Sequence, residues 1–173
     1  MTYRESYESP LGRMIMVSDG TALTALAFQG QKYYEKAVPW EAEEARLPIF
    51  DHTGQWLDIY FSGQEPTFTP TIATKGTLFQ EEVWEILKKI PYGQVVSYGE
   101  IAAAIAKSRG LKRMSAQAVG GAVGHNPVSV IIPCHRVVGT NGHLTGYAGG
   151  LDKKEELLRL ERADHTSVIR LMK

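Results

Sequence analysis

One cysteine occurs in the 173 residues, Cys134, and it lies between Pro133 and His135 in the stretch IIPCHRVVG. A free buried cysteine usually behaves as a small hydrophobic residue. Cys134 differs because the imidazole beside it can take its proton and generate a thiolate, the reactive form of the side chain. The apolar run VSVII, residues 128–132, predicts a strand that ends at Pro133, which cannot continue a hydrogen-bonded ladder. Neighbouring side chains of a strand point to opposite faces, so the pair requires a turn or a bridging water.

A carboxylate farther along the chain, Glu161, is a candidate partner for the imidazole. The segment LDKKEELLRLERADH predicts a helix with Asp152 at its N-cap and Glu155 at its third position. Glu161 follows Leu157 by four residues and Leu158 by three, so it shares the face that these leucines bury. A carboxylate on an apolar face needs a partner.

Cys134, His135 and Glu161 together would form a nucleophile, a base and a group that orients the base, as in the catalytic triads of proteases. The alternative is a structural salt bridge, which is the commoner role of such a carboxylate. The arginines available for it in the sequence are Arg136, Arg159 and Arg162.

Three helices are predicted before the cysteine. The first follows from the apolar stripe in TLFQEEVWEILKKI, residues 77–90. The second begins after Ser97, which forms a capping-box pattern with Glu100. The third, in SAQAVGGAVGHNP, has Ser115 at its cap and ends at Asn126-Pro127. This third helix carries mostly alanine and glycine, which favours close approach either of a large ligand or of another helix.

A basic segment, KSRGLKRM (107–114), separates the second and third helices. Its four cations could bind phosphate, although a solvated loop is the plainer interpretation. Helix, turn, helix, basic loop and helix, followed by the strand and a hairpin through TNG (140–142), indicate a winged helix-turn-helix, which is a nucleic-acid-binding architecture.

The N-terminal part is built differently. The runs RMIMV (13–17) and TALTALAF (21–28) predict strands separated by turns, and PIFDHTGQWLDIYFSG (48–63) predicts an amphipathic helix. We therefore expect two domains: an α/β domain over residues 1–74, with a small antiparallel sheet and a helix, and a mainly α winged helix-turn-helix domain over residues 75–173.

Charge and composition exclude several classes. Residues 1–70 carry five Lys and Arg against ten Asp and Glu, whereas residues 71–173 carry fourteen against nine, so the basic excess accompanies Cys134. No apolar run approaches the roughly 20 residues of a membrane span. The polar N-terminus predicts no secretory signal. A single cysteine excludes an internal disulfide and fits a reducing, cytoplasmic location.

The segment HNPVSVIIPCHRVVGTNGHLTGYAGGLDKKEELLRLE resembles the C-terminal domain of the O6-alkylguanine-DNA alkyltransferases, the methylated-DNA–protein-cysteine methyltransferases. The resemblance runs from about Thr77 to Glu161, and PCHRV with the upstream Asn-Pro is its most specific part. It implies an RNase H-like fold for the N-terminal domain. It also implies a repair protein that flips O6-alkylguanine, and by extension O4-alkylthymine, out of double-stranded DNA and takes the alkyl group irreversibly, once.

The resemblance assigns roles to the catalytic group. Cys134 would accept the alkyl group, His135 would deprotonate it through a water, and Glu161 would orient His135. Asn126 would hold the active-site turn. Tyr98 would help to rotate the lesion out of the duplex, bond the flipped guanine and act as an acid toward its ring.

The resemblance also assigns the binding residues. Tyr147 would line the pocket, the carbonyl of Val137 would bind the exocyclic amine of guanine, and the N–H of Ala148 would face O6. The residues expected to contact DNA are Lys112, Arg113, Ala116, Gln117, Gly120, Gly121 and Arg136.

This sequence departs from the family in two places. Gln117 stands where the family usually has an arginine that enters the base stack. The segment 107–114 is also longer than the corresponding segment of other family members. We expect no metal, no cofactor and no membrane partner, and a monomer. Two other functions are open to the same residues: a thiol hydrolase that turns over repeatedly, and a DNA-binding regulator with an unreactive cysteine.

Overall fold

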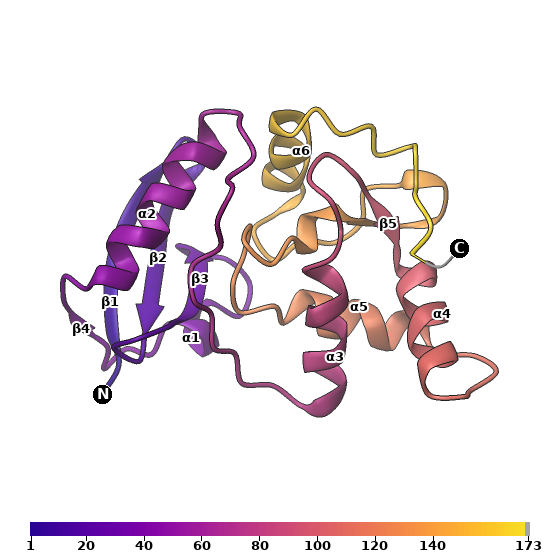
Figure 1. The fold of residues 1–173 in the computed structure, drawn as a ribbon, viewed down its shortest axis with the longest axis horizontal. Helices are drawn as coiled ribbons and strands as arrows, with labels where there is room; N and C mark the ends of the chain where they lie inside the picture. The colour runs from indigo at the N-terminus through magenta and orange to yellow at the C-terminus, as the bar shows by residue number, and fades with distance from the viewer. Residues whose placement is uncertain (172–173) are drawn as a thin grey trace. The chain divides into compact units, whose positions relative to one another are not determined.

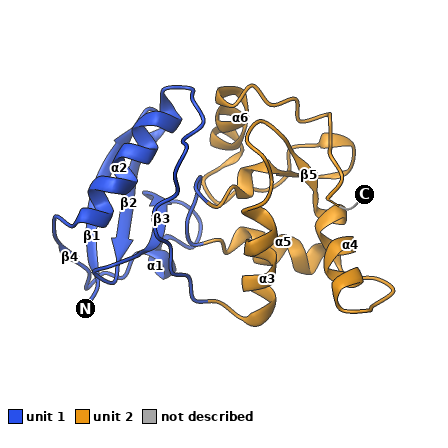
Figure 2. Ribbon diagram, viewed as in Figure 1, with its two compact units in different colours: residues 1–75, 127–131 blue, residues 76–126, 132–173 orange. Residues whose placement is uncertain are grey.

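The computed structural model describes residues 1–171, which form two compact units (Figures 1 and 2). The first unit comprises residues 1–75 together with 127–131, and the second comprises 76–126 and the residues from 132 onward. We expected a single division, between residues 74 and 75. In the structure, residues 127–131 also belong to the first unit. None of the helices formed by residues 1–171 has the length and apolar character needed to cross a membrane.

The first unit contains a four-stranded sheet in the order β3-β2-β1-β4. Strands β1, β2 and β3 are joined by tight turns and pair antiparallel, as the turn signals predicted. The sheet is mixed, however, because β4 pairs parallel with β1. The strands are β1 Tyr3–Ser9, β2 Gly12–Ser18, β3 Leu23–Phe28 and β4 Glu43–Glu44.

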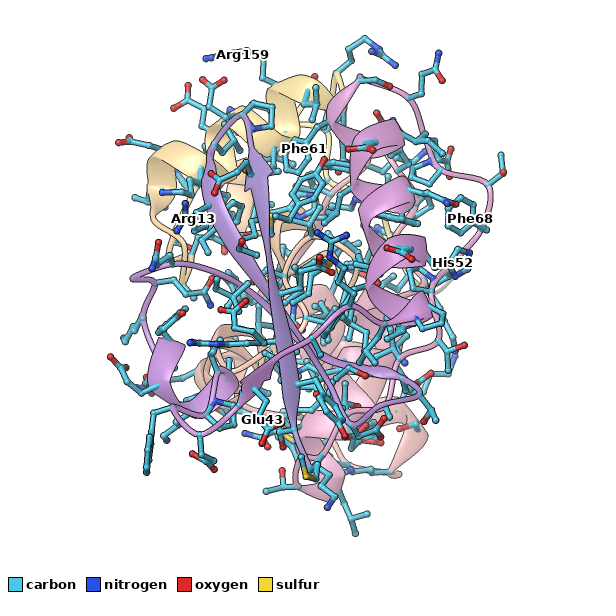
Figure 3. All side chains as sticks on the ribbon, turned by 90° about the vertical axis from the view of Figure 1, so that its left-hand side faces the viewer. Arg13, Glu43, His52, Phe61, Phe68 and Arg159 are labelled. Carbon is cyan, nitrogen blue, oxygen red and sulfur yellow. The ribbon has the colours of Figure 1, made fainter. Side chains whose placement is uncertain are left out.

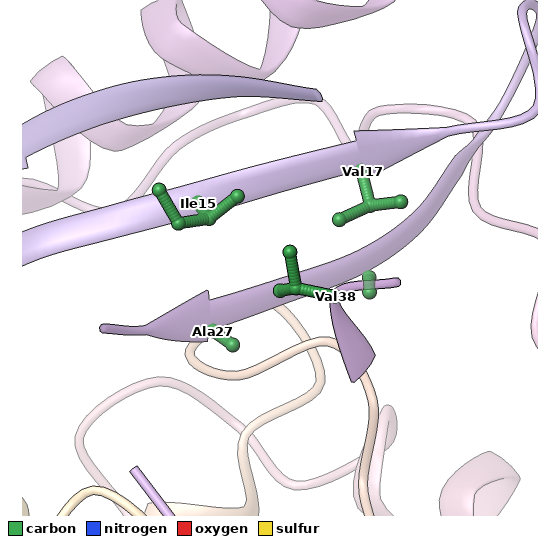
Figure 4. Close-up of a cluster of buried hydrophobic side chains, with 5 residues drawn as sticks. Ile15, Val17, Ala27 and Val38 are labelled. Atoms are coloured by element: carbon green, nitrogen blue, oxygen red, sulfur yellow. The ribbon is translucent and has the colours of Figure 1, made fainter. Parts of the chain in front are cut away.

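Both faces of the sheet are covered. Ile15 and Val17 of β2 pack with alanines of β3 and with Val38, which directly follows the short helix α1 Tyr34–Ala37 (Figure 4). Helix α2 Pro48–Phe61 packs on the strands through apolar residues at helical spacing. Burial on both faces explains why β2 is almost continuously apolar rather than alternating. The buried residues of α2 are Ile49, Phe50, Thr53, Trp56, Leu57 and Tyr60.

The segment that follows α2 packs back on the side of this helix that carries His52. His52 stacks on Phe68 with ring centroids 4.5 Å apart, and the two rings lie side by side in Figure 3. The chain then continues to Ile72, which forms an isolated parallel bridge with Leu23 of β3. The segment that connects α2 to the second unit is thus partly fixed to the edge of the sheet.

The second unit is mainly helical, with α3 Leu78–Leu87, α4 Tyr98–Ser108, α5 Ala116–Gly124 and α6 Leu151–Leu160. The predicted caps Ser97 and Ser115 are present, each accepting a hydrogen bond from the backbone N–H three residues on. Trp84 of α3 donates its indole N–H to the carbonyl of Ala122 at 2.9 Å, which packs α3 against α5. The apolar stripe and the two serine caps thus predicted α3, α4 and α5 correctly.

The strand predicted over VSVII (128–132) is wrong. Leu26 of β3 donates to the carbonyl of Pro127 at 2.8 Å and accepts from the N–H of Ser129 at 2.9 Å, and pairing goes no further. The chain then turns at Val130, whose φ is 71°. The same edge of β3 is also occupied at Leu23 by residues 71–73, which limits the room for a longer strand.

The predicted hairpin through TNG is also wrong. Residues Thr140–Gly142 form a 3-10 turn, and the paired strands of this unit are β5 Val96–Ser97 and β6 Val137–Val138, which run parallel. The last helix begins at Leu151 rather than after Asp152. Its N-cap is Gly150, whose φ of 100° suits glycine and ends the preceding loop there.

Candidate active site

Cys134 opens a 3-10 turn, Cys134–Arg136, and its residue is 6% exposed. Its backbone N–H donates to the carbonyl of Ile132 at 2.8 Å. Asn126 donates its side-chain amide to the same carbonyl at 2.7 Å and also hydrogen-bonds the sulfur of Cys134. One asparagine therefore fixes both the turn and the thiol. Cys134 and His135 lie in a turn, so the alternation of neighbouring side chains in a strand does not apply to them.

His135 and Glu161 are completely buried and lie 2.6 Å apart between Nε2 and Oε2. Burial, which disfavours the imidazolium, outweighs the attraction of the carboxylate and lowers the pKa of His135. Burial alone would raise the pKa of Glu161, but its contacts with His135 and Arg136 hold that pKa well below its usual range. The pair at neutral pH is a neutral imidazole that donates to a carboxylate, so Nδ1 is the ring nitrogen able to accept a proton.

Glu161 has further partners. Arg136 donates to it through Nε at 2.9 Å and Nη2 at 3.1 Å, and the backbone N–H of Gly93 donates at 3.0 Å. Arg136 also donates to the carbonyl of Ile90 at 2.7 Å. Glu161 therefore makes both of the contacts considered from the sequence. It hydrogen-bonds the imidazole of His135, and it forms a buried ion pair with Arg136.

The DNA contact expected of Arg136 does not fit this geometry. Its side chain is 10% exposed, and its donors are directed to Glu161 and Ile90 inside the second unit. The guanidinium is the buried counter-ion of the carboxylate, and removing it to reach phosphate would leave Glu161 with an uncompensated charge.

A residue that the sequence reasoning missed is Lys154. It is 0% exposed and its ammonium donates to three carbonyls, those of Val137, Thr145 and Gly146. Its spacing in the sequence indicates this burial. Lys154 precedes Leu157 by three residues and Leu158 by four, so it lies on the same apolar helical face as Glu161.

Burial sets the protonation of the thiol. It raises the pKa of Cys134, against the opposing effects of the hydrogen bond from Asn126 and the charge of Lys154. The resting side chain is therefore a thiol, and a base must remove its proton before it can attack as the thiolate.

The residues expected to bind the lesion lie in the same unit. Tyr98 opens α4, and its hydroxyl donates a long hydrogen bond of 3.5 Å to the carbonyl of Thr145. Burial raises the pKa of Tyr98, and a negative charge on Cys134 would raise it further. The carbonyl of Val137 accepts a hydrogen bond from Lys154 at 2.6 Å. Tyr147 and Ala148 are partly exposed in the loop before α6.

Helix α5 presents an open surface. Ala116, Gln117 and Gly121 are exposed, and Gly120 lies beside the ring of Tyr98. A Cβ placed on Gly121 or Gly124 would meet no other atom within 4 Å. Packing inside the molecule therefore gives no reason for these two glycines, which favours the other explanation, approach of an external ligand.

The basic segment ahead of α5 is only partly available to a ligand. Arg109 pairs with Glu82 of α3 at 3.0 Å. Lys112 and Arg113 are exposed. Among residues 1–171 there is no group of three or more His, Cys, Asp or Glu side chains that could hold a metal ion.

Known proteins resemble the chain over nearly its whole length. The family model for the DNA binding domain of 6-O-methylguanine DNA methyltransferase matches residues 78–163, and that for its ribonuclease-like domain matches residues 2–74. The methylated-DNA–protein-cysteine methyltransferase of Methanosarcina acetivorans is 42% identical over 92% of this chain and 97% of its own. That of Haemophilus influenzae is 38% identical over 92% of this chain and 86% of its own.

Solved structures agree. The O6-methylguanine methyltransferase of Mycobacterium tuberculosis superposes with a TM-score of 0.80 at 38% identity, covering 94% of this chain and 93% of its own. The OGT of the same organism in complex with DNA gives 0.81 at 38% identity and 92% of each chain. The expected fold, a ribonuclease-like domain followed by a helical DNA-binding domain, is confirmed. The chain belongs to the 6-O-methylguanine DNA methyltransferase family.

Proposed function

We propose that this chain, a methylated-DNA–protein-cysteine methyltransferase of DNA repair, transfers the alkyl group of O6-alkylguanine in double-stranded DNA to the sulfur of its own Cys134. The observation that carries the proposal is the buried turn in which Cys134 precedes His135, with His135 bound to Glu161 at 2.6 Å. A relative with a TM-score of 0.81 is known in complex with DNA, which supports DNA as the partner.

The target base must leave the stack. A side chain cannot reach O6 of guanine inside a duplex, so an enzyme acting there extrudes the nucleotide into a pocket, at a cost of a few kcal/mol. Tyr98 and Tyr147 supply aromatic walls that offset this cost. Helix α5, with alanine and glycine on its exposed surface, suits the narrow minor groove.

The transfer balances as a single displacement. The thiol proton of Cys134 passes through a bridging water to Nδ1 of His135. The thiolate attacks the alkyl carbon, a C–S bond forms, and the bond from carbon to O6 breaks with its electron pair staying on guanine. Tyr98, which its raised pKa keeps protonated, donates to the guanine ring as charge develops there. The imidazolium of His135 then returns its proton through solvent to the oxygen of Tyr98, so both side chains end neutral, the thiol has lost one proton and guanine has gained one.

The thioether product ends the reaction. No group of the site regenerates a thiol from it, so each molecule reacts once. The same displacement is open to O4-alkylthymine, whose oxygen also carries the alkyl group on a planar leaving base. One chain supplies all the proposed catalytic groups, so a monomer suffices.

Intact-mass analysis tests the proposal. After incubation with duplex DNA containing O6-methylguanine, the protein should gain the mass of one methyl group, located on Cys134 by peptide mapping. Cys134→Ser should bind the duplex and gain nothing. Repeated turnover, or methyl on another residue, would overturn the single-use mechanism. Parallel reactions with O4-methylthymine DNA decide whether that substrate belongs to the function.

A further inference from the structure

Lys154 is a buried cation whose hydrogen bonds all run to uncharged carbonyls. Its ammonium donates at 2.6 Å to Val137, at 2.8 Å to Thr145 and at 3.1 Å to Gly146. An ammonium has three donors, so these carbonyls use all of them. Burying a charge without a paired anion is costly, and side chains that bear this cost commonly serve a function.

The three carbonyls belong to two separate segments of the site. Val137 begins β6, directly after the turn that carries Cys134 and His135. Thr145 and Gly146 lie in the loop before α6, which has no helix or strand of its own, and Gly146 has a φ of 42°. Lys154, on α6, therefore joins the nucleophile turn to this loop.

The joined loop is the one expected to contact the lesion. Tyr147 and Ala148 directly follow the two carbonyls that Lys154 holds. Thr145 also accepts the longer hydrogen bond from Tyr98, at 3.5 Å. The ammonium lies 5.9 Å from the centre of the Tyr98 ring. One side chain thus contacts or fixes each segment from which a pocket for guanine would be built.

The charge of Lys154 also reaches the sulfur. Burial lowers the pKa of Lys154 to about 8, while a negative charge on Cys134 would raise it. The effect is mutual, since the lysine charge opposes the rise in the pKa of Cys134. A cation held in this place favours the thiolate at the moment when His135 takes the proton.

We propose that Lys154 is a positioning residue of the alkyl-transfer site, which holds the loop Thr145–Ala148 on β6 and supplies positive charge to the forming thiolate. The inference rests on the proposed function. Lys154 then contributes to transfer in two ways: its three carbonyl contacts fix the loop, and its charge favours the thiolate.

Two variants distinguish these contributions. Lys154→Met keeps a long side chain and loses both charge and hydrogen bonds, whereas Lys154→Arg keeps the charge and changes the geometry. Lys153→Met is the matched control, because it removes the neighbouring charge of the same helix from a partly exposed position. Each variant is assayed for transfer from duplex O6-methylguanine DNA, for the dissociation constant of unmodified duplex, and for alkylation of its only cysteine by iodoacetamide.

We expect Lys154→Met to lower the maximal transfer rate about 100-fold, the scale of a misplacement near 1 Å, and to raise the half-saturating lesion concentration. The dissociation constant of unmodified duplex should stay within about twofold. Compared with Lys154→Met, Lys154→Arg should regain more of the iodoacetamide reactivity than of the transfer rate. Iodoacetamide is small and needs only the thiolate that the positive charge favours, whereas transfer also needs the loop in place. Lys153→Met should match the wild type throughout.

Several results would overturn the inference. Transfer by Lys154→Met at the wild-type rate would show that neither contribution matters. If that variant does not fold by circular dichroism, Lys154→Arg decides, and full transfer by it would show that the carbonyl geometry is dispensable. An equal loss of lesion transfer, duplex binding and iodoacetamide reactivity would indicate a merely structural lysine. If the wild type itself transfers no methyl group, it is the proposed function that fails.

Discussion

At the scale of single residues, Glu161 is the centre of the site. It accepts hydrogen bonds from Nε2 of His135, from Nε and Nη2 of Arg136 and from the N–H of Gly93. The carboxylate therefore neutralises a buried guanidinium and orients an imidazole at once. Its two roles can be separated by measuring rate and stability in the same variant.

Glu161→Gln should slow alkyl transfer at least about 100-fold, because the amide no longer holds His135 as a competent base. Affinity for duplex DNA should change little, since Glu161 is buried within the second unit. Single-turnover transfer with radiolabelled O6-methylguanine duplex measures the first, and fluorescence anisotropy the second. A wild-type transfer rate in this variant would reduce Glu161 to a structural partner of Arg136.

Stability should depend on pH through the same residue. The pKa of Glu161 lies below its ordinary 4.5 in the folded protein, so its contribution to stability is complete above pH 4.5 and is lost as the pH falls through the folded value. The pKa of His135 lies below 6.5, so acid also favours the unfolded chain, which protonates this imidazole more readily.

Urea unfolding of the wild type and Glu161→Gln at a series of pH values measures this effect. The free energies of unfolding should differ by about 3 kcal/mol at pH 7, the loss expected when a buried pair is broken. The difference should shrink below pH 4.5. A difference that stays constant down to pH 3 would contradict the ionised pair.

The sequence predicted part of the site. Cys134, His135 and Glu161 follow from residue type and helical spacing, which are local. The sequence offered Arg136 as one of three possible partners of Glu161, and it could not select among them because the choice depends on how the turn at 134–136 directs the guanidinium to Glu161 and Ile90. Lys154 was missed because a lysine is expected at the surface, although its position on the helical face indicated otherwise.

At the scale of elements, α5 is the surface to test. Gly121→Leu adds a side chain where a Cβ meets no atom of the protein within 4 Å, so the fold should tolerate it. Removing a helical glycine should even stabilise the chain by about 0.5–1 kcal/mol. If DNA approaches α5 closely, duplex affinity should fall at least about tenfold, or about 1.4 kcal/mol.

The matched control is Gly54→Leu, at another helical glycine with nothing within 4 Å, in α2 of the first unit. It should leave duplex affinity unchanged in an anisotropy titration. Equal affinities of the two variants would mean that α5 does not face DNA.

Gln117 is the residue we expect to enter the base stack when guanine leaves it. It is exposed on α5 and stands where the family usually has an arginine. Its amide can bond the unpaired cytosine but brings no charge, which costs on the order of 1 kcal/mol. Gln117→Ala should slow repair of duplex DNA and leave the reaction with free O6-benzylguanine nearly unchanged. Gln117→Arg should bind duplex more tightly, and unaltered duplex repair by the alanine variant would exclude this register of the helix.

Elements were predicted where their signals are local. The caps Ser97 and Ser115 and the apolar stripes locate their helices because a helix closes its hydrogen bonds within four residues. The segment 128–132 failed because its pairing is decided by the free edge of β3, about a hundred residues earlier in the chain. Apolar composition alone could not show that two short segments share this edge.

At the scale of the whole molecule, zero net charge conceals a basic half that should bind phosphate. Replacing Lys112 and Arg113 by glutamine should reduce the slope of log affinity against log salt by about two, one for each lost phosphate contact. The same replacement at Lys32 and Lys36, in the acidic half, is the control. Duplex titrations at several salt concentrations give the slopes, and identical slopes for both variants would place the phosphate contacts elsewhere.

The insertion of 127–131 into the first unit has a consequence for cleavage of the chain. A protease that cuts in the connecting segment 62–76 breaks one covalent link, yet Leu26 still pairs with Pro127 and Ser129 across the cut. Each fragment then carries part of the first unit, and the two should copurify until a denaturant separates them. Nicked protein would run as two bands on a denaturing gel and as one species on a sizing column.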